Sequence, residues 1–315
     1  MPQQITIFGG SGFIGRALIR RLAKTGAIIR VATRDVEKTL PLKPMGNVGQ
    51  IVPIPCSVRS DTDVAEAIGQ SDIVINLLGI LFEKGRNNFK ALHVEAAARI
   101  ARTAKERGVK HLIHMSALGA DDHAASKYAQ SKAAGEQAIK TFYPKATIIR
   151  PSIVFGAEDN FFNKFAGLAQ LSPALPLIGG GLTKFQPVYV DDVAHAICKV
   201  LEKTETAGQL FELGGPQVYS FRQLLEYILE VTHRQRSLIN MPWALASFKA
   251  IFLQLAPQPM LTCDQVLMLK SDNVVKGGKT FRDLDMQATA LELIVPTYLA
   301  RFRPVNAKQE AHPIQ

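Results

Sequence analysis

Tyr128 and Lys132 stand four residues apart in a segment with a helical pattern. Because residues at i and i+4 share a helix face, the lysine ammonium is expected to lie near the phenol and to lower its pKa. Such a phenol can donate or accept a proton in carbonyl reduction. Ser116 precedes the pair and follows a predicted strand, at the sheet edge where ligands bind. These three residues are the candidate catalytic group, although a tyrosine and a lysine at this spacing also occur on solvated helices.

A glycine-rich segment near the amino terminus has the pattern of a dinucleotide phosphate site. Gly9, Gly12 and Gly15 lie between the apolar strand at residues 5–8 and an amphipathic helix that starts near residue 13. The first glycine permits a sharp turn, the second lets N–H groups approach a pyrophosphate, and the third allows close packing of helix on strand. The helix N-terminus adds partial positive charge. A purely structural turn is the alternative.

The second predicted strand, residues 27–33, indicates which nicotinamide cofactor fits. Thr33 stands where NAD-binding proteins place an acid for the ribose 2′-hydroxyl, and Arg34 follows it. A guanidinium can hold a 2′-phosphate by charge-assisted hydrogen bonds, so NADP(H), and NADPH more than NADH, is favoured. Asp35 could serve NAD if the strand ends two residues later, and a surface arginine without a role is a further alternative.

Composition limits the other functions. The chain has 315 residues, 47% of them hydrophobic and 20% charged, with a net charge of +10 that suits anionic cofactors, acidic partners or an anionic membrane surface. Nothing in the pattern favours nucleic-acid binding. The three cysteines and seven histidines show no metal-ligand spacing, so no metal is expected. With a strand from residue 5 and no long apolar run, we expect neither a targeting peptide nor a membrane span, and a soluble or peripheral protein.

Strands and helices alternate over the first half of the chain, which predicts an α/β fold, a Rossmann-type doubly wound parallel sheet with a smaller C-terminal mixed α/β domain. Further strands are expected at 50–54, 72–77, 111–114 and 147–150, and helices at 91–107 and 127–142. The expected domains are residues 1–156 for NADP(H) and 157–303 for a partner or substrate, followed by a polar tail at 304–315. A strand and helix at 185–201 can pack back on the first domain.

Two segments of the second half raise alternatives. Asp191 and Asp192 precede a predicted helix at 193–201, and we interpret them as a helix cap with no catalytic role. Residues 241–257 place large apolar side chains at helical spacing with Lys249 as the single charge. This helix is either buried in the second domain or docks on a membrane protein or at the lipid headgroup layer.

Taken together, five motifs resemble the extended or atypical short-chain dehydrogenases/reductases: Gly9 to Gly15, Asn76-Leu-Leu-Gly79, Ser116, Tyr128-x-x-x-Lys132 and Pro151-Ser-Ile-Val-Phe-Gly156. Within that group, residues 42–50, 71–79, 150–163 and 186–192 are similar to the NADPH-binding accessory subunits of respiratory complex I, NADH:ubiquinone oxidoreductase. The segment Pro44-Met-Gly-x-x-Gly-Gln50 is the most distinguishing one. The resemblance covers residues 5 to about 300.

The resemblance implies a nucleotide held as a structural group and assigns residues to it. The pyrophosphate is expected at the glycine loop, the 2′-phosphate at Arg34, the adenine near residues 57 and 58, the ribose side at residues 77–79, the nicotinamide ribose at Tyr128 and Lys132, and the nicotinamide under residues 151–153. The assigned residues are Gly9, Ser11, Gly12, Phe13, Ile14, Gly15, Arg34, Ser57, Val58, Leu77, Leu78, Gly79, Ser116, Tyr128, Lys132, Pro151 and Ile153.

Two departures from the broader superfamily bear on activity. Cys56-Ser57 stands where an acid commonly contacts adenine, and His93 stands where catalytic relatives usually carry an asparagine of the proton relay. The resemblance therefore implies an accessory subunit with a structural or assembly role. Its expected partners are complex I subunits near the junction of peripheral arm and membrane, with anionic lipid headgroups, and its expected location is cytoplasmic, at the inner face of a bacterial energy-transducing membrane. The intact Tyr128 and Lys132 leave a free NADP-dependent reductase, epimerase or dehydratase as the alternative.

Overall fold

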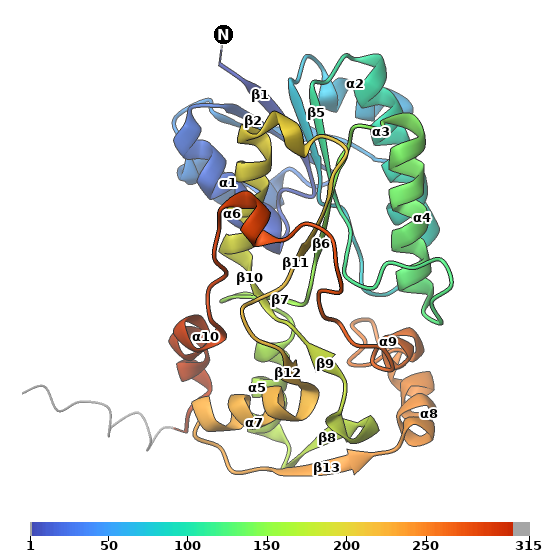
Figure 1. Ribbon diagram of the computed structural model, residues 1–315, viewed down its shortest axis with the longest axis vertical. Coiled ribbons are helices and arrows are strands. Elements are labelled where there is room, and N and C mark those ends of the chain that lie inside the picture. Colours follow the sequence, from blue (N-terminus) through green and yellow to red (C-terminus); the bar gives the residue numbers. More distant parts are fainter. Residues whose placement is uncertain (1, 305–315) are drawn as a thin grey trace, which may run out of the picture. The chain divides into compact units, whose positions relative to one another are not determined.

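The computed structural model describes residues 2–304, which divide into two compact units (Figure 1). The first unit comprises residues 2–151, 190–213 and 276–287, and the second comprises residues 152–189, 214–275 and 288–304. The two units therefore alternate along the chain. The expected division into residues 1–156 and 157–303 has a single boundary and does not include this alternation. Residues 305–315 of the expected polar tail lie outside the described residues.

A seven-stranded, all-parallel sheet organises the first unit. Its strands lie in the order β3 (Ile51–Pro55), β2 (Ile28–Thr33), β1 (Gln4–Phe8), β4 (Ile73–Asn76), β5 (His111–Met115), β6 (Thr147–Pro151) and β11 (Leu210–Leu213). The strand order reverses between β1 and β4, and ligands of doubly wound sheets bind at the carboxyl ends beside such a reversal. The Rossmann-type fold class predicted from the alternation of elements is confirmed.

Helices cover both faces of this sheet (Figure 1). One side carries α1 (Phe13–Leu22) and α6 (Val190–Glu202), and the other carries α2 (Asp61–Ile68), α3 (Ala96–Glu106) and α4 (Lys127–Phe142). The core beneath α2, α3 and α4 contains fully buried Phe8, Val74, Ile100 and Leu112. Short 3-10 segments occupy Ala23–Thr25, Glu37–Met45, Thr204–Thr206 and Phe281–Leu284.

The expected helix at residues 91–107 begins with a π-helical turn instead. Lys90–Glu95 is π-helical and α3 follows directly. This turn packs tightly on α4, because a Cβ atom at Gly135 would lie 2.2 Å from the His93 carbonyl oxygen. Single π turns inside helices are often found at functional sites. Packing against a distant helix set this geometry, so the local pattern did not reveal it.

The expected Asp191-Asp192 cap is wrong, since α6 begins at Val190 and both aspartates lie in its first turn. Asp191 instead forms a two-point ion pair with Arg21 of α1, with distances of 2.9 Å and 2.5 Å. This pair joins two helices that are far apart in sequence, on the same side of the sheet.

The second unit combines three two-stranded sheets with five α-helices in its described residues. The parallel pairs are β7 (Val154–Phe155) with β10 (Val188–Tyr189) and β8 (Ala174–Ile178) with β13 (Ser237–Met241), and the antiparallel pair is β9 (Lys184–Phe185) with β12 (Tyr219–Ser220). The helices are α5 (Phe162–Leu171), α7 (Phe221–Val231), α8 (Trp243–Leu253), α9 (Cys263–Met268) and α10 (Leu291–Leu299). Helices α8 and α9 pack against each other. Short 3-10 segments occupy Gly179–Gly181 and Ala300–Phe302.

Aromatic rings fill the core of the second unit. Phe161 lies 5.2 Å from Phe162 and 6.1 Å from Phe221 between ring centroids, and Phe155 and Phe185 join the same cluster. Buried Asp159 accepts a 2.6 Å hydrogen bond from the Tyr298 hydroxyl, which ties α10 to the start of α5. Within the described residues, no helix has the length and apolar content needed to span a bilayer.

Candidate dinucleotide site

The glycine loop connects β1 to α1 in the geometry that an anion requires. Gly9 has a positive φ of 80°, and Gly12 stands at the N-cap of α1 without a side-chain cap. A Cβ atom at Gly15 would lie 2.4 Å from the Gly10 carbonyl oxygen, so only glycine permits this approach. The first turn of α1 contains no acidic residue, and its N–H groups face the loop end of the helix. These features suit a pyrophosphate, and the assignment of Ser11, Phe13 and Ile14 to it stays a prediction.

The turn at Leu77 to Gly79 lies against this loop. A Cβ atom at Gly9 would meet the Leu77 carbonyl group at 3.1 Å, and the Leu77 N–H donates to the Phe8 carbonyl oxygen at 2.9 Å. The Leu78 N–H donates to Asn76 Oδ1 at 3.1 Å, which fixes the turn directly after β4. The two segments that the sequence assigned to one nucleotide are therefore brought together.

His93 links this turn to α4. The Ile80 N–H donates to His93 Nε2 at 3.0 Å, so Nε2 is the acceptor nitrogen and the proton stands on Nδ1. Nδ1 lies 2.8 Å from Ser131 Oγ, and that hydroxyl donates to the Tyr128 carbonyl oxygen at 2.7 Å. Burial lowers the pKa of His93 to about 3, with a further contribution from the Lys132 charge. His93 is thus a neutral side chain with both ring nitrogens engaged.

The Tyr128 and Lys132 side chains differ from the sequence expectation. Burial raises the pKa of Tyr128 to about 12, and its ring meets those of Phe89 and His93 edge-on at 5.9 Å and 5.6 Å. Burial also lowers the pKa of Lys132 to about 8. The expected lowering of the tyrosine pKa by the lysine is wrong for this structure, because desolvation dominates at both groups.

Lys132 connects α4 to the end of β5. Its ammonium donates to the Met115 carbonyl oxygen at 2.8 Å, and a Cβ atom at Gly79 would lie 4.0 Å from Nζ. The next residue, Ser116, has a buried Oγ without a hydrogen-bond partner among the described residues. A buried hydroxyl without a partner costs free energy, so this atom suits a polar group of a ligand. Ser116, Lys132 and Gly79 are therefore grouped at the carboxyl edge.

The other end of the predicted site is exposed and basic. Arg34 follows β2 and donates from Nη1 to Asn87 Oδ1 at 3.2 Å. The Asp35 carboxylate accepts the Glu37 N–H at 3.2 Å and lies 3.5 Å from Lys38 Nζ, so it is engaged within its own turn. Arg34 is therefore a candidate group for an anion here.

The remaining predicted site residues lie at or just after the ends of their strands. Ser57 and Val58 follow β3; the Ser57 N–H donates to Asp63 and the Val58 carbonyl accepts from Arg99. Pro151 ends β6, and Ile153 belongs to the second unit, where its N–H donates to Asn273 Oδ1 at 3.1 Å. Nothing in these contacts tests their assignment to adenine or nicotinamide, which stays a prediction.

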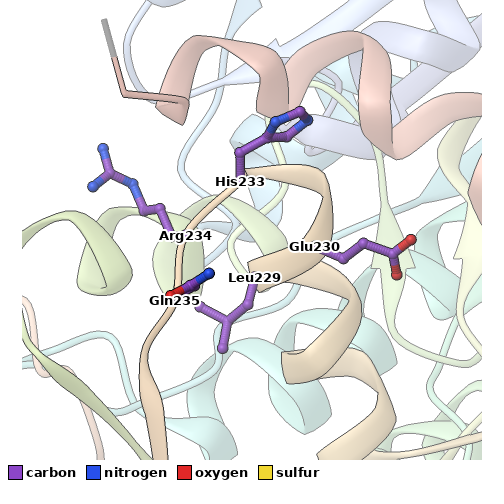
Figure 2. A pocket seen from close by; sticks show the side chains of 5 residues that line it. All are labelled: Leu229, Glu230, His233, Arg234 and Gln235. Atoms are coloured by element: carbon purple, nitrogen blue, oxygen red, sulfur yellow. The ribbon is translucent and has the colours of Figure 1, made fainter. Parts of the chain in front are cut away.

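Figure 2 shows a surface hollow lined by Leu229, Glu230, His233, Arg234 and Gln235. The Glu230 and Arg234 side chains point apart, so the charged groups do not converge on a ligand. We place the candidate site at the sheet edge, because strand ends, glycine contacts and the unpartnered Ser116 hydroxyl converge there. No group of potential metal ligands occurs in the described part of the chain.

The NAD dependent epimerase/dehydratase family matches residues 5–214. The chain belongs to this family. It is also 34% identical over 311 residues to "NADH dehydrogenase [ubiquinone] 1 alpha subcomplex subunit 9, mitochondrial" of Arabidopsis thaliana, a match that covers 95% of this chain and 77% of that protein. The "NADH-ubiquinone oxidoreductase 40 kDa subunit, mitochondrial" of Neurospora crassa is 30% identical, with coverage of 98% and 81%. The predicted resemblance to accessory subunits is confirmed.

A solved structure supports the fold. The crystal structure of UDP-glucose 4-epimerase with UDP-glucose from Thermotoga maritima superposes with a TM-score of 0.72 at 18% identity, covering 95% of this chain and 98% of that one.

The segment from Pro44 to Gln50 has a structural role here. The buried Gln50 amide donates to the carbonyl oxygens of Ala23 and Ala27 at 2.7 Å and 3.1 Å, and its Oε1 accepts the Asn47 N–H at 2.9 Å. Gln50 immediately precedes β3, so it lies at the sheet edge opposite the carboxyl ends. The sequence did not reveal this role or those of Asn76 and Ser131, because each depends on contacts with residues of other elements or turns.

Proposed function

We propose that this chain is an NADP(H)-binding accessory subunit of respiratory complex I, with a structural or assembly role and no part in electron transfer. The observation that carries the proposal is its identity with the alpha subcomplex subunits over nearly its whole length. The locked, neutral His93 supports it, since a histidine with both nitrogens engaged cannot relay protons without breaking a buried hydrogen bond.

The test is co-migration. The tagged chain, expressed at its native level, should migrate with complex I from membranes solubilised in mild detergent. A protein recovered only as free monomer would contradict the proposal. Loss of the assembled complex on deletion of the gene, with restoration by the wild-type chain, would support the assembly role.

For the cofactor, we propose NADPH rather than NADH. The glycine loop would hold the pyrophosphate, Arg34 the 2′-phosphate, and Lys132 the nicotinamide ribose. A bound NADPH could supply a hydride, but a subunit with a structural role does not transfer it. Arg34→Ala should weaken NADPH binding about 10-fold or more and leave NADH binding unchanged. Equal losses for both nucleotides in titration calorimetry would remove the 2′-phosphate assignment.

We further propose that α8 lies on the anionic headgroup layer beside the junction of peripheral arm and membrane, on the cytoplasmic face of a bacterial membrane. This helix buries Ala246 and Ala250 completely but leaves Phe248 and Phe252 about 60% exposed, which reverses the usual orientation of large apolar side chains. It is firmly held, because the Trp243 ring fills the space where Gly179 would carry a Cβ atom.

Charge favours lipid over a second protein at this face. No acidic residue occurs between Glu230 and Asp264, whereas Arg234, Arg236 and Lys249 do. A double variant, Phe248→Ser with Phe252→Ser, should lose sedimentation with phosphatidylglycerol-containing vesicles, and pure phosphatidylcholine vesicles should bind the wild type more weakly. Leu293→Ser on α10 is the matched control, since this leucine is also exposed. The lipid assignment would be contradicted if the wild-type protein bound both kinds of vesicle equally well, or if it bound neither.

A second candidate function, a free NADP-dependent reductase or epimerase, is favoured by the unpartnered Ser116 hydroxyl near Lys132. In that case Tyr128→Phe should abolish turnover while sparing NADPH binding. Wild-type protein without activity on a broad panel of carbonyl compounds and nucleotide sugars would argue against it.

A further inference from the structure

The segment from Ile80 to Phe89, here called the strap, connects the two ends of the candidate site. It starts directly after the Leu77–Gly79 turn and folds back at a two-residue hairpin. Lys84 N donates to the Asn87 carbonyl oxygen at 2.8 Å, and Asn87 N donates back to Lys84 at 3.0 Å. The strap has a hairpin of its own and is therefore an ordered element rather than an open loop.

Both chain ends of the strap are fixed at the Tyr128 side. The Ile80 N–H donates to His93, and the buried Phe89 ring stacks on the His93 ring with centroids 5.3 Å apart. Phe89 also meets the Tyr128 ring edge-on. The strap is therefore anchored at both of its ends to the residues beside the predicted nicotinamide ribose.

The hairpin tip reaches the basic end of the site. Arg34 donates to Asn87 Oδ1 at 3.2 Å, and the Arg59 guanidinium donates to the Arg86 carbonyl oxygen. Arg34 and Arg59 follow neighbouring strands, since Thr33 of β2 pairs with Pro55 of β3 at the same sheet edge. Both acceptors on the strap are uncharged carbonyl oxygens, and both arginines are exposed.

We propose that Arg59 completes a two-arginine site for the nucleotide 2′-phosphate and that the strap retains the bound nucleotide along its length. A phosphate dianion is a stronger acceptor than an amide or a peptide carbonyl, so the guanidinium groups exchange the strap oxygens for phosphate oxygens or share them. The two arginines then make the site selective for NADPH, and the strap slows release of the nucleotide. This inference rests on the proposed nucleotide-binding function.

The selectivity is tested with Arg59→Ala. The variant should bind NADPH about 10-fold more weakly than the wild type and bind NADH equally well, and inorganic phosphate should compete with NADPH less effectively in the variant. Arg107→Ala, an exposed arginine beyond the end of α3, is the matched control and should change neither affinity. Unchanged NADPH affinity in Arg59→Ala overturns the two-arginine site.

The retention is tested with a shortened strap in which residues 84–87 are replaced by two glycines. Bound NADPH, chased with excess unlabelled nucleotide and followed by its fluorescence, should dissociate at least 10-fold faster than from the wild type, and bound NADH should also dissociate faster. An unchanged dissociation rate overturns the strap. If the wild-type protein binds neither nucleotide, the proposed nucleotide-binding function fails together with this inference. If the wild type binds NADPH tightly and the variants have the same affinity and dissociation rate, this inference alone fails.

Discussion

The two ends of the candidate site are built differently. At the Tyr128 end, Lys132, His93 and Ser116 are at least nine-tenths buried, and two of them are engaged in hydrogen bonds within the protein. At the Arg34 end, Arg34 and Arg59 are exposed and donate to carbonyl oxygens of the strap. The first end belongs to the protein core and the second to its surface.

This difference separates folding from binding. Changes at His93 or Lys132 should lower the free energy of unfolding, because each removes a buried hydrogen bond. Changes at the Arg34 end should act on nucleotide affinity alone. A structural nucleotide site benefits from this division, since a rigid end holds the shape of the site while charge at the other end selects the ligand.

The largest expected effect is that of His93→Ala. The substitution leaves the Ile80 N–H without its acceptor and opens a cavity under the Phe89 ring, so the free energy of unfolding should fall by about 3 kcal/mol. Urea unfolding measures it, with the exposed His123→Ala as control. A loss below about 1 kcal/mol would show that the Tyr128 end is not part of the core.

Gly15→Ala should have the next largest effect. The new Cβ atom would meet the Gly10 backbone at 2.4 Å, and overpacking of this kind costs about 1–3 kcal/mol. Nucleotide affinity should fall with stability, because the displaced backbone is the phosphate loop itself. In contrast, Gly277→Ala has no atom within 4 Å of the new Cβ and should leave both quantities unchanged. A fully stable Gly15→Ala that binds NADPH normally would refute the tight-loop argument.

Much of the fold followed from local signals. Alternating apolar strands and amphipathic helices predicted the parallel sheet, and the helix at 127–142 was predicted with its observed bounds from its apolar and charged sides. In the structure, Ser126 caps this helix by accepting the Ala129 N–H. The π turn at Lys90–Glu95 could not be predicted in the same way. Its cause is the contact between His93 and Gly135, which are remote in sequence.

The site was predictable as a set of strand ends but not as an electrostatic environment. Gly9 with Leu77, and Gly79 with Lys132, meet because parallel strands end at one edge of the sheet. Burial raises the pKa of Tyr128, whose ring packs against Phe89 of the strap, and the Lys132 ammonium is engaged by the Met115 carbonyl oxygen. Neither is visible in a Tyr-x-x-x-Lys spacing, so the direction of the pKa shift was predicted wrongly.

Acid should destabilise the Tyr128 end in a defined pH window. His93 has a pKa of about 3 in the folded protein and about 6.5 when unfolded, so between these values only the unfolded chain takes up the proton. Stability from the neutral imidazole is present above pH 6.5 and is lost as pH falls toward 3. Relative to His93→Asn, the wild-type free energy of unfolding should fall by up to about 1.4 kcal/mol per pH unit between pH 6 and pH 4. If the free energies of unfolding of the wild type and of His93→Asn changed with pH in parallel, a buried, neutral His93 would be contradicted.

The smallest effect on folding should come from Arg34→Ala combined with Arg59→Ala. Both side chains are exposed and donate to the strap. Exposed contacts of this kind contribute little, so the free energy of unfolding without nucleotide should change by less than about 0.5 kcal/mol. Saturating NADPH should stabilise the wild type far more than this double variant, because ligand stabilisation follows affinity. Thermal unfolding with and without NADPH measures both. A double variant that is unstable without nucleotide would place the arginines in the core and remove the distinction between the two ends of the site.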